Sequence, residues 1–189
     1  MSALRVGATA PALELPAADG SGMRSLSAFR GRRVLISFLG PAHCVFCRAH
    51  VVRAIQHRED FARLGADVLL VAYHDPELLT AKMLRDLDLP FTLLLDSTRE
   101  TYRRWGLEGA TVRNWLAPGF YLGLVKLLIK QRTNLGDSPG PVQMGGDFVI
   151  APDGRLVFTN YMKSFHDRAS IPTLLDALAQ APQGGQTSV

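Results

Sequence analysis

The residues of this 189-residue sequence most suited to chemistry are its two cysteines, Cys44 and Cys47, which are separated by two residues. A C-x-x-C pair is typical of thiol–disulfide redox sites, because one thiolate attacks and the second thiol closes a disulfide. At the start of a helix this spacing can bring the two β-carbons within the roughly 3.5–4.5 Å that a disulfide needs. We therefore expect redox chemistry and an intramolecular Cys44–Cys47 disulfide on oxidation.

The elements around the pair should position it at a strand-to-helix junction. Residues 34–39 are almost all apolar, which predicts a buried central strand, and Gly40 and Pro41 end it. A helix is predicted from about residue 42 to 64, with Cys44 in its first turn. Helical spacing places Cys47 on the apolar stripe, so we expect Cys47 to be sheltered and Cys44 to be more exposed.

A thiolate at this position would be stabilised by the unpaired N–H groups and the dipole of the helix. The sequence has no Ser, Thr, Asp or Asn to cap the helix, so we expect the sulfur of Cys44 to take part of that role. The neighbouring His43 and Arg48 are supporting residues that could lower the cysteine pKa from about 8.5 to roughly 3.5–7.5. On this basis Cys44 is predicted to attack and Cys47 to resolve.

Two other interpretations of the pair are open. Both thiols could be small buried hydrophobic groups, which is common for free cysteine. His43, Cys44, Cys47 and His50 are also four soft ligands that zinc accepts in principle, but one helix cannot aim four side chains at one point. We therefore expect no metal and no cofactor.

The rest of the chain predicts an α/β fold. Its order of strand, helix, strand, helix, strand favours parallel pairing with right-handed crossovers. Together with an antiparallel hairpin and a terminal helix, it predicts a thioredoxin-like three-layer sandwich with a mixed central sheet. The predicted elements are an opening hairpin over residues 6–15 with a turn at 18–22, a helical turn at 25–31, strands at 67–73 and 91–95, helices at 76–87 and 99–105, a hairpin of strands 147–150 and 156–161, and a helix at 171–180.

The length fits a single domain over residues 1–181, with a disordered tail over 182–189. A helical insertion is predicted at 107–141, before the last hairpin, with an amphipathic helix around 121–131. Between Ser97 and Gly136 there are seven basic residues against two acidic ones. The apolar face of the insertion should pack beside the active site or form a dimer contact, so a homodimer is one predicted arrangement.

Composition excludes several classes of function. The net charge is only +4, and no base-reading motif or interleaving of aromatic and basic residues suggests a nucleic-acid partner. No apolar stretch reaches the roughly 20 residues that a transmembrane helix needs. Two cysteines are too few for a disulfide scaffold, and no signal-peptide pattern opens the chain, so we expect a cytoplasmic protein.

Three further stretches carry recognisable patterns: Val6-Gly7-Ala8-Thr9-Ala10-Pro11-Ala12-Leu13, Leu26-x-x-Phe29-x-Gly31, and Gly146-Asp147-Phe148-Val149-Ile150-x-Pro152-Asp153-Gly154. These resemble the peroxiredoxins, the alkyl hydroperoxide reductase and thiol-specific antioxidant family, over about residues 6–179. The C-x-x-C site, the Tyr102-x-x-Trp105-Gly106-Leu107 segment, the basic insertion and the Gly145-Gly146 pair are most similar to the peroxiredoxin-like 2 branch. That resemblance implies a thioredoxin fold, a hydroperoxide or disulfide substrate, and a thiol donor such as thioredoxin or glutathione.

The sequence departs from ordinary peroxiredoxins at the site. If Cys47 is aligned with their peroxide-attacking cysteine, Cys44 stands where their loop has threonine. They also carry an arginine just before the Phe-x-Ile strand, where this chain has residues 143–146. Within that segment, Gly145 and Gly146 either form an ordinary turn into the strand or are supporting residues that let a substrate or partner backbone approach Cys44.

The sequence thus predicts a thiol-dependent antioxidant oxidoreductase that reduces hydroperoxides. One rival is a thioredoxin-like disulfide reductase or isomerase. The non-enzymatic rival is a redox-sensing or partner-binding thioredoxin-fold module.

Overall fold

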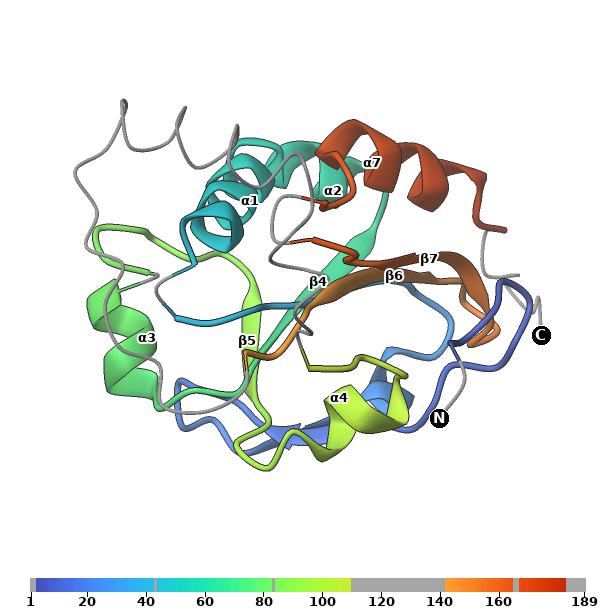
Figure 1. Ribbon diagram of the computed structural model, residues 1–189. Coiled ribbons are helices and arrows are strands. Elements are labelled where there is room, and N and C mark those ends of the chain that lie inside the picture. The colour runs from blue at the N-terminus through green and yellow to red at the C-terminus, as the bar shows by residue number, and fades with distance from the viewer. Residues whose placement is uncertain (1–2, 43, 83, 110–141, 165–166, 183–189) are drawn as a thin grey trace.

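The computed structural model describes residues 3–42, 44–82, 84–109, 142–164 and 167–182. Among these residues, five strands form one central sheet in the order β5-β4-β3-β6-β7 (Figure 1). Strand β3 is parallel to β4, and β4 to β5, whereas β6 is antiparallel to both β3 and β7. The sheet is therefore mixed, as predicted. The strands are β3 (Arg33–Phe38), β4 (Ala66–Ala72), β5 (Thr92–Leu95), β6 (Gly146–Ile150) and β7 (Leu156–Tyr161).

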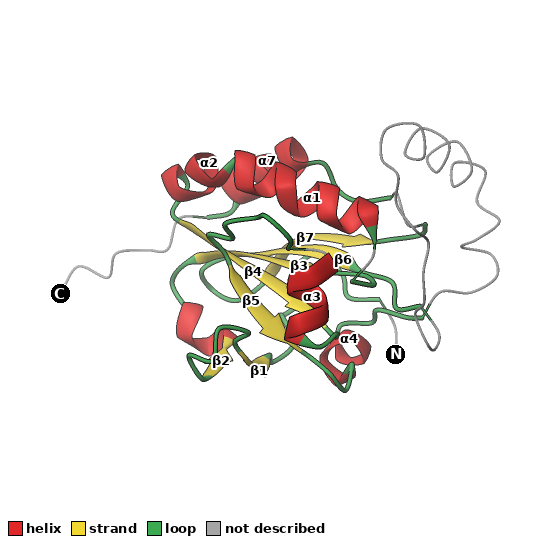
Figure 2. Cartoon of the chain, turned by 90° about the vertical axis from the view of Figure 1, so that its left-hand side faces the viewer, coloured by secondary structure: helices red, strands yellow, loops and turns green. Residues whose placement is uncertain are grey.

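Helices and a hairpin cover the two faces of the sheet (Figures 1 and 2). Helices α1 (Val45–Gln56), α2 (Arg58–Arg63) and α7 (Ile171–Gln180) lie on one side. The hairpin of β1 (Glu14–Pro16) and β2 (Met23–Ser25) lies on the other side with α4 (Glu100–Arg104). The described part of the chain is completed by η1 (Leu26–Phe29) and α3 (Pro76–Lys82). This arrangement confirms the predicted thioredoxin-like three-layer sandwich.

The central strand β3 is mostly apolar because both of its faces are covered. Leu35 packs with the helices α1, α2 and α7, and its neighbours Val34 and Ile36 pack with the aromatic cluster on the opposite face. All three side chains are 1% exposed or less. Successive residues of a strand point to opposite faces, so a continuous apolar run indicates a strand buried on both sides.

Four of the predicted boundaries were wrong. The helix predicted over 42–64 is two helices, because the backbone leaves helical geometry at His57. Helix α1 begins at Val45, so Cys44 precedes the first turn instead of lying in it. Helix α3 ends at Lys82, short of the predicted residue 87.

In the opening segment the strands are shorter and later than predicted, and residues 6–13 contribute one bridge, from Thr9 to Arg155. Pro11 in that segment lacks the N–H that a strand ladder needs.

The closing elements match their predictions. Helix α7 has the predicted bounds, and the side chain of Ser170 caps it by accepting a hydrogen bond from the Thr173 N–H. The predicted insertion helix around 121–131 and residues 183–189 of the predicted tail (182–189) lie outside the described residues, so the domain division stays a prediction. Within the described residues, no helix has both the length and the apolar character needed to cross a membrane.

Candidate active site

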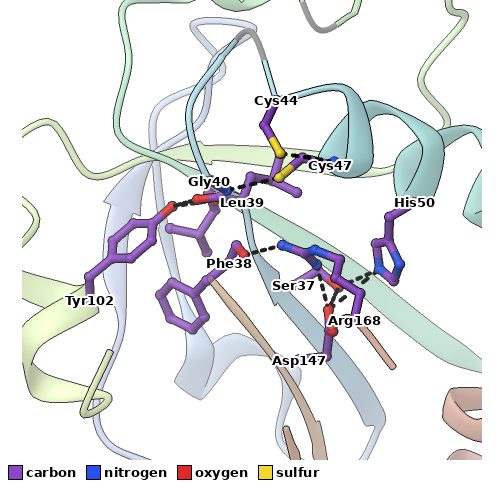
Figure 3. A network of polar contacts seen from close by, with 11 residues as sticks. Ser37, Phe38, Leu39, Gly40, Cys44, Cys47, His50, Tyr102, Asp147 and Arg168 are labelled. Atoms are coloured by element: carbon purple, nitrogen blue, oxygen red, sulfur yellow. Dashed lines mark hydrogen bonds and ion pairs between the residues drawn. The ribbon is translucent and has the colours of Figure 1, made fainter. Parts of the chain in front are cut away.

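The cysteine pair lies where β3 passes into α1, at the carboxyl end of the central strand (Figure 3). Cys44 is the N-cap of α1, and its Sγ accepts a hydrogen bond from the Cys47 N–H at 3.3 Å. The sulfur of Cys44 thus takes the capping role that the sequence predicted. Cys47 lies in the first turn and is fully buried, whereas Cys44 is half-buried.

The sulfur of Cys47 sits close to the loop that leaves β3. The N–H of Gly40 donates a hydrogen bond to it at 3.4 Å. A β-carbon at position 40 would lie 3.2 Å from the same sulfur, so glycine permits this close approach. The hydrogen bond from the Cys44 thiol, the positive charge of Arg168 and the Gly40 N–H together lower the pKa of Cys47 to about 7, against burial, which raises it.

The other thiol has the opposite tendency. The pKa of Cys44 is raised well above its usual value because its thiol hydrogen-bonds to Cys47, and because burial and the neighbouring charge oppose a second thiolate. Two thiols this close share one negative charge, and the sulfur with more donors carries it. These contacts favour Cys47 as the thiolate, whereas the sequence favoured Cys44.

Arg168 brings the positive charge from the segment just before α7. Its Nη1 donates to Asp147 Oδ1 at 2.8 Å, and its Nη2 donates to the Phe38 carbonyl at the end of β3 (Figure 3). The side chains of Arg168 and Asp147 are 5% and 0% exposed. The guanidinium therefore joins β3, β6 and the start of α7 directly behind the cysteine pair.

Asp147 has two further partners. It is paired with Ser37 in the β3–β6 register, and the Ser37 hydroxyl donates to its Oδ1 at 2.8 Å. His50, one turn after Cys47 on α1, places Nε2 at 3.4 Å from the same oxygen. Burial raises the pKa of Asp147, but Arg168 and His50 outweigh burial and hold it well below its usual range. Burial lowers the pKa of His50 in spite of Asp147, so the ring is neutral at pH 7.

The predicted supporting residues lie as follows. His43 is outside the described residues. Arg48 is on α1, and its Nη2 donates to the Arg85 carbonyl at 2.9 Å. The cation that lowers the pKa of Cys47 is Arg168.

Gly145 and Gly146 lie at the start of β6, where neighbouring groups approach closely. A β-carbon at Gly145 would clash with the Phe38 carbonyl oxygen and lie 2.8 Å from Arg168 Nη2. One at Gly146 would lie 2.6 Å from the Asn160 carbonyl oxygen. Both glycines are thus required by contacts within the chain, and Gly145 leaves room for Arg168. Whether they also admit a substrate backbone stays a prediction.

The ligand set considered for zinc is divided between two environments. His50 faces Asp147, whereas Cys44 and Cys47 face each other. Across the residues that the structure describes, no three His, Cys, Asp or Glu side chains form a group that could hold a metal ion. The remaining candidate, His43, is outside them.

Sequence reasoning missed Arg168, Asp147 and Ser37. Asp147 and Ser37 carried a signal, because each is a polar residue in an otherwise apolar strand and buried polar groups need partners. Arg168 carried none, since it lies in a polar segment after the last strand. Its guanidinium nevertheless lies beside the site, although the sequence has no arginine just before β6.

Comparison with known proteins identifies the class to which this fold and site belong. The sequence model of the AhpC/TSA family matches residues 6–158, and the chain belongs to this family. The family-level resemblance is therefore confirmed, and the narrower peroxiredoxin-like 2 branch stays a prediction.

Particular relatives are peroxiredoxins. The chain is 36% identical over 107 residues to a putative peroxiredoxin of Mycobacterium tuberculosis, a match that covers 56% of this chain and 66% of the relative. It is 31% identical over 109 residues to the peroxiredoxin Bcp of Escherichia coli, covering 58% of this chain and 69% of that protein. The crystal structure of peroxidoxin BcpB from M. tuberculosis has the same fold, with a TM-score of 0.65 at 18% identity, covering 93% of this chain and 95% of that one.

Proposed function

We propose that the protein is a thiol peroxidase in which Cys47 attacks a hydroperoxide and Cys44 resolves the product. The observation that carries the proposal is the environment of the Cys47 sulfur. It is fully buried, its pKa is about 7, and it lies with Arg168, the Gly40 N–H and the Cys44 thiol. A thiolate of this kind is about half formed at pH 7 and keeps most of its nucleophilicity. Membership of the AhpC/TSA family supports the same activity.

In the first step the Cys47 thiolate attacks the terminal peroxide oxygen. The S–O bond forms as the O–O bond breaks, giving Cys47 sulfenic acid and an alkoxide or hydroxide that takes up a proton. The guanidinium of Arg168 is suited to stabilise the negative charge as it moves from sulfur to the leaving oxygen. Because Cys47 has no exposed surface, the groups around its sulfur must shift when peroxide enters.

In the second step the Cys44 sulfur attacks the sulfenic acid. A Cys44–Cys47 disulfide forms and water leaves. Cys44 is already in contact with Cys47 through the cap of α1, so this step needs little rearrangement. The high pKa of Cys44 keeps it protonated during the first step, when its S–H stabilises the thiolate.

In the third step an external thiol reduces the disulfide. Attack at the half-buried Cys44 sulfur gives a mixed disulfide and releases Cys47, which is the better leaving group because its pKa is lower. A second donor thiol then frees Cys44. Thioredoxin or glutathione would serve as the donor, which fits a cytoplasmic location. A homodimer stays a prediction.

Peroxide consumption by the purified full chain with a thioredoxin system or glutathione tests the proposal. Turnover should require Cys47 absolutely and should fall strongly in the Cys44→Ser variant. Insulin reduction measured alongside distinguishes the rival disulfide reductase. Fast insulin reduction without peroxide turnover would contradict the proposal, and the absence of both activities would favour a non-enzymatic sensing module.

A further inference from the structure

A single peptide group links Tyr102 to the sulfur of Cys47. The carbonyl of Leu39 accepts a hydrogen bond from the Tyr102 hydroxyl at 2.7 Å. The N–H of the same peptide belongs to Gly40 and donates to Cys47 Sγ at 3.4 Å. Figure 3 shows the hydroxyl and the sulfur on opposite sides of this peptide.

Because a peptide is planar, its C=O and N–H turn together. A hydroxyl that holds the carbonyl of Leu39 therefore also aims the N–H of Gly40. Hydrogen bonds in such a chain polarise one another, and they are electrostatically stronger away from water. The bond from Tyr102 should thus make the Gly40 N–H a better donor to the Cys47 thiolate.

The tyrosine is held rigidly enough for this role. Its side chain is fully buried, and its ring packs edge-on against Phe38 with centroids 4.9 Å apart. Its backbone N–H donates to Asp96 Oδ2 at 3.1 Å, which ties the short helix α4 to the residue that follows β5. The hydroxyl shares its single hydrogen between the carbonyl of Leu39 and that of Val71, whose oxygen lies 2.8 Å away. The Val71 carbonyl also accepts a hydrogen bond from the Leu39 N–H, so it keeps a partner when the hydroxyl is removed.

We propose that Tyr102 is a positioning residue for the reactive thiolate, acting through the Leu39–Gly40 peptide. Its purpose rests on the proposed peroxidase function, but the coupling between hydroxyl and sulfur does not. Burial raises the pKa of the Tyr102 hydroxyl well above its usual value, so it remains a donor at every pH at which Cys47 titrates.

The test is a pH titration of the thiolate, followed by its ultraviolet absorbance in the Cys44→Ser background. Tyr102→Phe should raise the pKa of Cys47 by roughly half a unit to one unit and slow its reaction with peroxide at pH 7 about two- to fivefold. The matched control is Tyr161→Phe. Its hydroxyl also donates to a backbone carbonyl, that of Trp105 at 3.0 Å, but not to the peptide beside Cys47. It should leave the pKa of Cys47 unchanged.

A folded Tyr102→Phe protein with an unchanged Cys47 pKa would overturn the proposal. If Tyr102→Phe does not fold, 3-fluorotyrosine at position 102 keeps the packing and donates more strongly. It should shift the pKa of Cys47 downward, and no shift would equally overturn the proposal. These titrations need no peroxide. A protein that shows the shifts but lacks turnover would contradict the proposed function and leave the positioning role standing.

Discussion

Arg168 and Asp147 form an ion pair at 2.8 Å with side chains that are 5% and 0% exposed, directly behind the two cysteines. A pair so deeply buried contributes little net stability, because removing two charges from water offsets most of their attraction. Its consequence is local: it keeps one guanidinium charged and oriented beside a thiol.

Arg168→Lys keeps the charge but cannot hold both Asp147 and the Phe38 carbonyl with a planar fork. We expect the pKa of Cys47 to rise and the free energy of unfolding to fall by about 1–3 kcal/mol. Thiolate titration and urea denaturation measure the two effects.

The matched control for this substitution is Arg33→Lys. Arg33 is a partly buried arginine that donates to the carbonyls of Leu64 and Ala181, on other parts of the chain. The Arg33→Lys variant should be less stable to unfolding, but the pKa of Cys47 should be unchanged. Equal pKa shifts in both variants would show that the effect on Cys47 is not specific to Arg168.

The buried His50 predicts a loss of stability in mild acid. Its pKa is lowered in the folded protein, so below the unfolded value of about 6.5 the unfolded chain binds more protons than the folded one. The free energy of unfolding should therefore decrease as the pH falls from about 6.5 toward 5.

The His50→Gln variant isolates this contribution to the pH dependence. It should be less stable at pH 7 but show a flatter slope in this window, measured by urea denaturation at a series of pH values. An unchanged slope would mean that His50 takes up its proton equally in the folded and unfolded states.

Gly145→Ala should disturb the site through packing alone. The new methyl group would clash with the Phe38 carbonyl and Arg168. Forcing them apart should lower the free energy of unfolding by about 1–3 kcal/mol. Because Arg168 must move, the pKa of Cys47 should rise as well.

Gly109→Ala is the control for this packing effect. Its β-carbon would lie at an ordinary 3.7 Å from the Val142 carbonyl oxygen. Calorimetry should therefore report a clear loss of stability for Gly145→Ala and a small change in stability for Gly109→Ala. Similar stability of the two proteins would indicate that the backbone at Gly145 yields easily.

The sequence predicted the strand, the turn and the helix around the cysteines, because apolar runs and glycines act locally. It predicted that the Cys44 sulfur caps the helix, but it started the helix at about residue 42, whereas α1 begins at Val45. Arg168 could not be predicted, because its contact with the site exists only after α7 has packed on the sheet. The role of Asp147 could have been predicted, since a carboxylate in a buried strand requires a partner.

The central claim is that Cys47 carries the thiolate and attacks first. Dimedone trapping of sulfenic acid after one equivalent of hydrogen peroxide, read by mass spectrometry in the Cys44→Ser and Cys47→Ser variants, tests it most directly. The account predicts a dimedone adduct on Cys47 in the Cys44→Ser protein and none in the Cys47→Ser protein. An adduct on Cys44 in the Cys47→Ser protein, with Cys47 unmodified in the other variant, would contradict it.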